Sequence, residues 1–131
     1  MSIKRVICPE RVRKVPAQFS WVDHRLVRDG HIERCDAYAA ALYLFLVTVA
    51  DAKGLSYYSD ASLARRLSMD SKRLSQARAA LIRLGLIAHD TPLYQVLALD
   101  WPLPRAGNQS VAGEMRARVL RLREALGKNS P

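Results

Sequence analysis

The most regular pattern of apolar residues in this chain lies between residues 60 and 87. Apolar residues recur there at intervals of three and four, which is the spacing of one face of an α-helix. They form two runs, the first of Leu63, Ala64 and Leu67 and the second of Leu74, Ala77, Leu81 and Leu84. The pattern predicts two amphipathic helices, over about residues 60–68 and 71–84.

The residues between the two runs are typical of a tight turn. Met69 is an apolar residue that we expect to fill the space between the helices. Asp70 or Ser71 can accept hydrogen bonds from the free N–H groups at the start of the second helix. Gly85 follows the last apolar position, where a left-handed C-cap is favoured. Two short helices joined in this way predict a helix-turn-helix.

A long apolar segment precedes this motif. Asp36 is the predicted N-cap of a helix that runs to about Lys53 and stops at Gly54. Because this helix is apolar on almost every side, we expect other elements to cover it on several sides. Residues 55–58 are β-prone and predict a short strand.

A β-hairpin is predicted after the motif. The apolar segments 86–89 and 93–99 flank the sequence Asp90-Thr91-Pro92, which is typical of a turn. The whole chain therefore predicts a mainly α fold with a small β-hairpin. Its order of helix, short strand, helix-turn-helix and two-stranded wing is that of a winged helix.

The segments outside the helices and strands differ in character. Residues 1–18 form a basic N-terminal arm that we expect to be extended, and residues 19–100 form the domain. The first part of the domain, residues 19–30, is expected to dock on the core as a short strand or helical turn, through Phe19, Trp21, Val22, Leu26 and Val27.

A linker and a last helix are predicted beyond the domain. Pro102 and Pro104 favour an extended path over residues 101–109. Residues 110–127 predict an amphipathic helix with apolar residues at heptad spacing, starting at Ala112 and continuing through Met115, Val119, Leu122 and Leu126. Since so short a helix needs a packing partner, we expect a homodimer with these residues at its interface. The alternative is that they fold back onto the long apolar helix of their own chain.

The distribution of charge indicates a polyanionic partner. The net charge is +9, and both ends of the chain are more basic than its middle. Residues 61–85, however, contain six Lys and Arg residues and a single acidic residue, Asp70. Such a surface suits DNA, RNA or an anionic membrane, although a basic surface also serves solubility.

The outward face of the second predicted helix offers the chemistry for reading DNA. Arg and Lys match the acceptors of guanine, and Gln matches adenine. We therefore predict base contacts from Ser71, Lys72, Arg73, Ser75 and Gln76. Phosphate contacts are predicted from Arg65, Arg66, Arg78 and Arg83, and from Arg11, Arg13 and Lys14 of the arm.

The sequence resembles the winged helix-turn-helix superfamily over about residues 36–99. The resemblance is carried by LARRLSMD, ARAALIRLGLI and YQVLAL. The long apolar helix ending in ADAKG, followed by YYSDASLARRL, looks like the winged-helix domains of plasmid and phage replication initiators and related regulators. The resemblance implies duplex DNA binding, with the third helix in the major groove. This wing departs from the usual pattern, because it carries Asp90 and no basic residue.

Other functions receive less support from the sequence. There is no GxSxG, Walker loop, HExxH or glycine fingerprint, and no Cys/His spacing typical of zinc, so we expect no enzyme activity, cofactor or metal. Two isolated cysteines and the absence of an apolar leader predict a cytoplasmic protein, and the resemblance implies a bacterial one. A winged helix that only binds proteins remains an alternative, as does RNA binding, although no RRM or KH signature is present.

Overall fold

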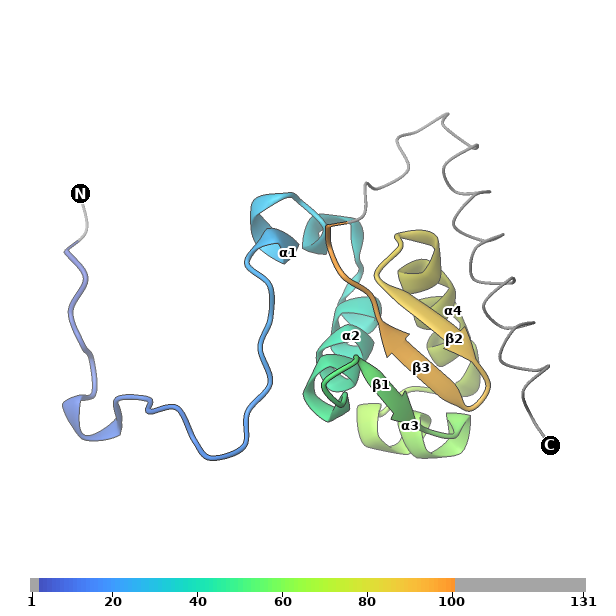
Figure 1. The fold of residues 1–131 in the computed structure, drawn as a ribbon, viewed down its shortest axis with the longest axis horizontal. Coiled ribbons are helices and arrows are strands. Elements are labelled where there is room, and N and C mark those ends of the chain that lie inside the picture. Colours follow the sequence, from blue (N-terminus) through green and yellow to red (C-terminus); the bar gives the residue numbers. More distant parts are fainter. Residues whose placement is uncertain (1–2, 101–131) are drawn as a thin grey trace.

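A computed structural model gives the fold, and it describes residues 3–100. These residues form four α-helices and one antiparallel sheet of three strands (Figure 1). In chain order the elements are α1 (Arg25–Arg28), α2 (Ala37–Val49), β1 (Leu55–Tyr57), α3 (Asp60–Leu67), α4 (Ser71–Arg83), β2 (Ile87–Asp90) and β3 (Leu93–Val96). Two short 3-10 turns, Pro9–Arg11 and Ile32–Arg34, precede α2. The predicted mainly α fold with a β-hairpin is confirmed at this level.

Helix α2 lies at the centre of the core. Asp36 caps it by accepting a hydrogen bond from the Ala39 N–H at 2.8 Å. Ala39, Leu42 and Leu46 are completely buried, and α2 packs against both α4 and β3. The predicted position of this helix under several other elements is therefore confirmed.

The helix-turn-helix forms as the apolar spacing predicts. Leu63 of α3 and Leu74 and Leu81 of α4 are completely buried, and Met69 is buried in the turn between the helices. Asp70 is the N-cap of α4 and accepts a hydrogen bond from the Arg73 N–H at 2.7 Å. Burial of these leucines directs the opposite side of α4 toward solvent.

The sheet is larger than the predicted hairpin. Strand β3 lies in the middle and pairs with β2 on one side and with β1 on the other. The hairpin was predicted from local pattern, whereas the β1–β3 pair joins segments far apart in the sequence. Tyr94 of β3 is completely buried, opposite Ser56 on β1 and His89 on β2.

Helix α2 ends earlier than predicted. It stops at Val49 rather than near Lys53, because the Asp51 carboxylate accepts hydrogen bonds from the N–H groups of Lys53 and Leu55, at 2.8 and 2.9 Å. These bonds favour a turn over continued helix. Gly54 belongs to that turn, with φ +85°, and a side chain there would meet the Val96 carbonyl oxygen at 2.6 Å.

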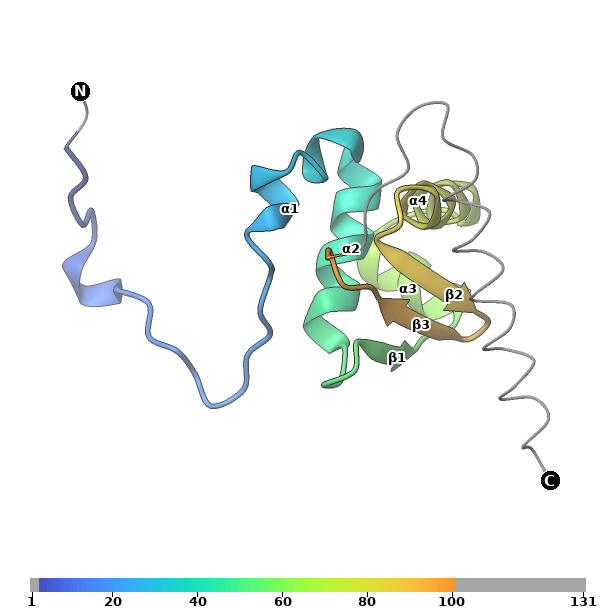
Figure 2. The same cartoon turned by 45° about the horizontal axis from the view of Figure 1, so that its top comes forward.

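The N-terminal docking segment forms a helical turn, α1, as one of its two predicted forms, but most of its predicted anchors are exposed. Leu26 is buried in α1, but Phe19, Trp21, Val22 and Val27 are exposed. Residues 3–18 run apart from the helices and the sheet (Figures 1 and 2), whereas residues 19–22 lie beside α2, where the Ser20 hydroxyl donates to the Thr48 carbonyl oxygen at 3.0 Å. The arm was expected to be extended, and it is, with one 3-10 turn at Pro9–Arg11. These four apolar side chains are therefore exposed, in contrast to the prediction.

The predicted linker and last helix lie outside the described residues. This applies to residues 101–109 and 110–127, and so to Met115, Val119, Leu122 and Leu126. The homodimer stays a prediction from the sequence.

Leu81→Ala should destabilise the fold strongly. Leu81 is completely buried in the face of α4 that carries Leu74 and Ala77. Removing such a side chain costs about 2–5 kcal/mol of unfolding free energy. Ile82→Ala is the matched control, since Ile82 is 44% exposed and its loss should cost about 0.5 kcal/mol or less. Equal losses for the two variants in urea unfolding would contradict this packing.

Candidate nucleic-acid interface

The exposed face of α4 brings together the residues predicted to contact bases. All five of them are exposed: Ser71, Lys72, Arg73, Ser75 and Gln76. They lie in the first half of the helix, and Leu74 and Ala77 among them point inward and are buried. The packing of α4 thus separates an apolar side from a polar side that is open to a partner.

Arg73 is held differently from its neighbours. Its guanidinium carbon lies 4.4 Å from the centre of the Tyr38 ring, which is close enough for a cation–π interaction. Tyr38 is on the first turn of α2 and is partly exposed. Among the described residues the Arg73 guanidinium has no hydrogen bond or ion pair, so its N–H donors remain free for a ligand.

Three of the four predicted phosphate-binding residues on the helices are exposed. Arg65 and Arg66 occupy the last turn of α3, directly before the turn into α4, and Arg83 occupies the last turn of α4. None of the three forms an ion pair within the described part of the chain. They are therefore available to an anion.

Arg78 has a different role from the predicted one. Its guanidinium donates to the Asp60 carboxylate at 2.7 and 3.2 Å and to the Tyr94 hydroxyl at 2.7 Å. The Arg78 side chain is only 15% exposed. This network joins α4 to α3 and β3, so Arg78 stabilises the fold and is not free to bind phosphate. The network also favours the ionised form of Asp60, because the hydrogen bond from Arg78 lowers the pKa of this carboxyl group.

The basic residues of the arm are exposed but lie apart from α4. Arg11 closes the 3-10 turn, and Arg13 and Lys14 follow it in extended backbone. Figure 2 shows this segment well away from the helices and the sheet. The structure therefore does not bring the arm and α4 into one continuous surface.

The β2–β3 turn offers little to a polyanion. It consists of Thr91 and Pro92 and directly follows Asp90, the last residue of β2, and no Lys or Arg occurs between Arg83 and Arg105. Any contact that this turn makes with DNA would bring the Asp90 carboxylate toward phosphate, which like charge disfavours.

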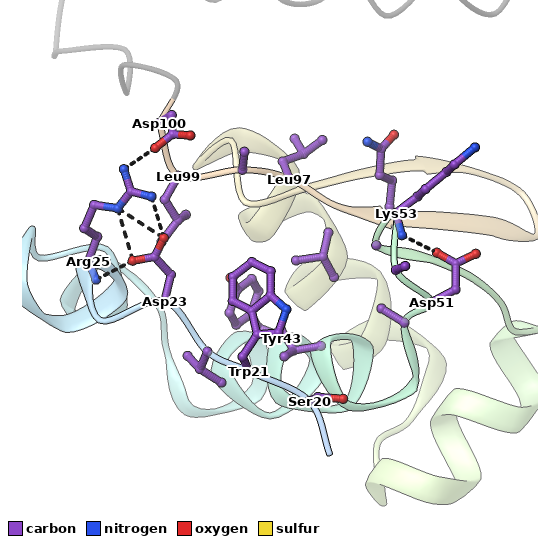
Figure 3. A pocket seen from close by; sticks show the side chains of 18 of the residues that line it. Ser20, Trp21, Asp23, Arg25, Tyr43, Asp51, Lys53, Leu97, Leu99 and Asp100 are labelled. Carbon is purple, nitrogen blue, oxygen red and sulfur yellow. Dashed lines mark hydrogen bonds and ion pairs between the residues drawn. The ribbon is translucent and has the colours of Figure 1, made fainter. Parts of the chain in front are cut away.

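A pocket of about 460 Å³ opens on another part of the domain (Figure 3). Residues 19–25, the end of α2, the turn after it and residues 95–100 line this pocket, and neither α3 nor α4 contributes. Its acidic groups are all engaged: Asp23 and Asp100 pair with Arg25, and Asp51 accepts from the backbone N–H groups of Lys53 and Leu55. The hydrogen bond from Arg25 lowers the pKa of Asp23 to about 2. The lining thus holds no free acid–base pair.

Two side-chain contacts of α4 could not be predicted from the sequence. Tyr38 and Arg73 belong to helices that only the fold brings together, as do Arg78 and Asp60. Neither pair has the short spacing from which a contact can be predicted.

Burial raises the pKa of Cys35, which makes its thiol less reactive. Within residues 3–100 no group of His, Cys, Asp and Glu could hold a metal ion.

Comparisons with known protein families, with curated protein sequences and with solved structures found no match. Among the described helices, none combines the length and the apolar character needed to cross a membrane.

The Asp60–Arg78 pair should make stability depend on acid pH. Since the folded protein holds the pKa of Asp60 below its ordinary value of 3.8, the pair stabilises the fold above that pH. This contribution is lost as the pH falls through the lowered pKa. The melting temperature of the native chain should therefore fall more steeply below pH 4 than that of Asp60→Asn. Parallel curves for the two proteins would contradict the assignment.

Proposed function

We propose that this chain is a winged helix-turn-helix protein that binds duplex DNA without enzymatic activity. The role would be that of a transcriptional regulator or of an accessory factor in replication or of a mobile element. The observation that carries the proposal is the row of five exposed polar residues in the first half of α4, opposite a completely buried apolar face. The order of helix, strand, two helices and two strands agrees with that fold.

In this proposal α4 enters the major groove. The groove is about 12 Å wide and admits one α-helix with its side chains. Arg73 or Lys72 would donate to the O6 and N7 atoms of guanine, and Gln76 would pair with adenine. Ser71 and Ser75 are short and suit either base or a nearby phosphate.

Phosphate binding would come from the exposed cations around this helix. Arg65, Arg66 and Arg83 are at helix ends on the same helix-turn-helix, where they can fix the position of α4 on the duplex. Arg11, Arg13 and Lys14 would bind the backbone farther away, because they lie on the extended arm. Arg78 is left out, because Asp60 and Tyr94 occupy its donors.

A salt titration tests the proposal as a whole. Each phosphate that the protein neutralises adds about 0.9 to the slope of log K against log salt concentration. Fluorescence anisotropy with a random-sequence duplex should therefore show binding that weakens steeply as salt rises. No binding at low salt, or affinity that ignores salt, would reject the proposal.

Base and phosphate contacts should separate by mutation. Arg73→Ala and Gln76→Ala should each cost roughly 1–3 kcal/mol of discrimination at one base position, because a base edge loses its partner. Arg66→Ala should weaken binding to all duplexes alike and reduce the salt slope by about one contact. Binding selection on random duplexes, followed by titration of each variant, gives both quantities. If all three variants behave alike, the division between base and phosphate contacts is wrong.

A protein-binding module is the second candidate function. The observation that favours it is the exposure of apolar side chains on the arm and on the segment that follows it, including Ile3, Ile7, Val15, Phe19 and Trp21. Such side chains are usual at interfaces between proteins. Light scattering on the DNA-free chain checks the expected homodimer, and a stable assembly without DNA affinity would favour this second function.

A further inference from the structure

We propose that Tyr38 is a positioning residue that holds Arg73 ready to read a base. The inference rests on the proposed function, because it concerns one contact within the proposed DNA interface. It goes beyond that function by assigning specificity to a residue on α2, outside the helix-turn-helix. It follows from the 4.4 Å contact between the Arg73 guanidinium and the Tyr38 ring.

Both partners of this contact stand on fixed backbone. Tyr38 is in the first turn of α2, which the Asp36 carboxylate caps. Arg73 is in the first turn of α4, and its own N–H donates to Asp70. The next residue along each helix, Ala39 and Leu74, is completely buried where the two helices pack. The distance between the backbones of Tyr38 and Arg73 is therefore determined by the packing of the core and not by the bound DNA.

The stacked arrangement leaves the useful part of the arginine free. A cation–π contact occupies one face of the planar guanidinium, whereas its N–H donors point outward in the plane. Those in-plane donors form the fork that matches O6 and N7 of guanine. Because no described residue pairs with the Arg73 guanidinium, nothing must be broken before the fork binds a base.

Stacking also reduces the cost of ordering the side chain. A free arginine has many rotamers, and most of them must be given up when it docks on one base. Contact with Tyr38 removes part of this freedom before DNA arrives. Cation–π contacts at exposed sites correspond to a factor of about two to five in an equilibrium constant. We expect the specificity ratio to change by that factor when the ring is removed.

The role predicts a particular response to substitution. The ring, and not the hydroxyl, supports Arg73, so Tyr38→Phe should behave like the native protein. Tyr38→Leu keeps an apolar side chain but removes the aromatic face. Tyr57→Leu is a matched control, because Tyr57 is also an exposed tyrosine but lies on β1.

The experiment measures discrimination on full-length protein. The readout is the ratio of dissociation constants for a selected duplex and for the same duplex altered at the base that Arg73→Ala no longer distinguishes. Tyr38→Leu should lower this ratio about two- to five-fold, while Tyr38→Phe and Tyr57→Leu leave it unchanged. In an Arg73→Ala background, Tyr38→Leu should have no further effect on the ratio. A merely structural role for Tyr38 would not show this dependence on Arg73.

Three results would overturn the inference while leaving the proposed function intact. The first is an unchanged ratio for Tyr38→Leu. The second is a Tyr38→Phe variant that loses as much as Tyr38→Leu, which would assign the effect to the hydroxyl. The third is equal weakening of binding to every duplex by Tyr38→Leu. If the native chain binds no duplex or discriminates none, the proposed function itself fails.

A second measurement needs no DNA. The Tyr38 ring should shift the NMR signals of the Arg73 side chain in the free protein, because they lie over an aromatic face. The shift should persist in Tyr38→Phe and disappear in Tyr38→Leu. Identical Arg73 signals in all three proteins would show that the ring does not hold this side chain, and would reject the inference.

Discussion

The packing of α4 against α2 is the contact on which the proposed interface depends. Leu74 and Leu81 of α4 and Leu42 and Leu46 of α2 are completely buried in one core. Each buried leucine favours this arrangement by about 1.5–3 kcal/mol relative to exposure. Rotation of α4 about its axis would bring these side chains into water and the charged face into the core. Hydrophobic burial thereby fixes which residues of α4 face a partner.

Polar contacts then fix the other elements relative to this pair. Asp36, Ser59 and Asp70 each cap the start of one helix, so the ends of α2, α3 and α4 are defined by single side chains. The network of Arg78, Asp60 and Tyr94 joins α4 to α3 and to the central strand. The Arg78 guanidinium is poorly exposed, and such a cation is tolerated only where it is hydrogen-bonded and paired with an opposite charge. Tyr94 and Asp60 supply these two partners. The arrangement of α3 and α4 therefore depends on Arg78, which the sequence alone suggests to be a surface arginine.

Sequence alone predicted what depends on neighbouring residues. The periodic leucines predicted α3 and α4 within one residue of their ends. Asp36 was predicted as the cap of α2, and Asp70 was one of the two residues predicted as the cap of α4. The early end of α2 was missed because the Asp51 side chain competes for backbone N–H groups, which composition does not reveal. The β1–β3 pair, the Arg78 network and the Tyr38–Arg73 contact were missed because each joins distant segments. Trp21 and Phe19 were expected to be buried because they are aromatic, yet burial also requires a surface to cover them.

Two kinds of basic residue result from this architecture, and they suit different tasks. A base edge accepts hydrogen bonds only within narrow limits of distance and angle, so reading it favours a side chain whose backbone and direction are already fixed. Arg73 meets that condition, since its backbone is capped and its guanidinium is stacked. Attraction to phosphate falls off gradually with distance, so it tolerates flexible cations. Arg13 and Lys14, on an arm outside the core, meet only this weaker condition. In the proposed interface, Arg73 would therefore serve base reading, where direction matters, and Arg13 and Lys14 would serve phosphate binding, where charge alone is sufficient.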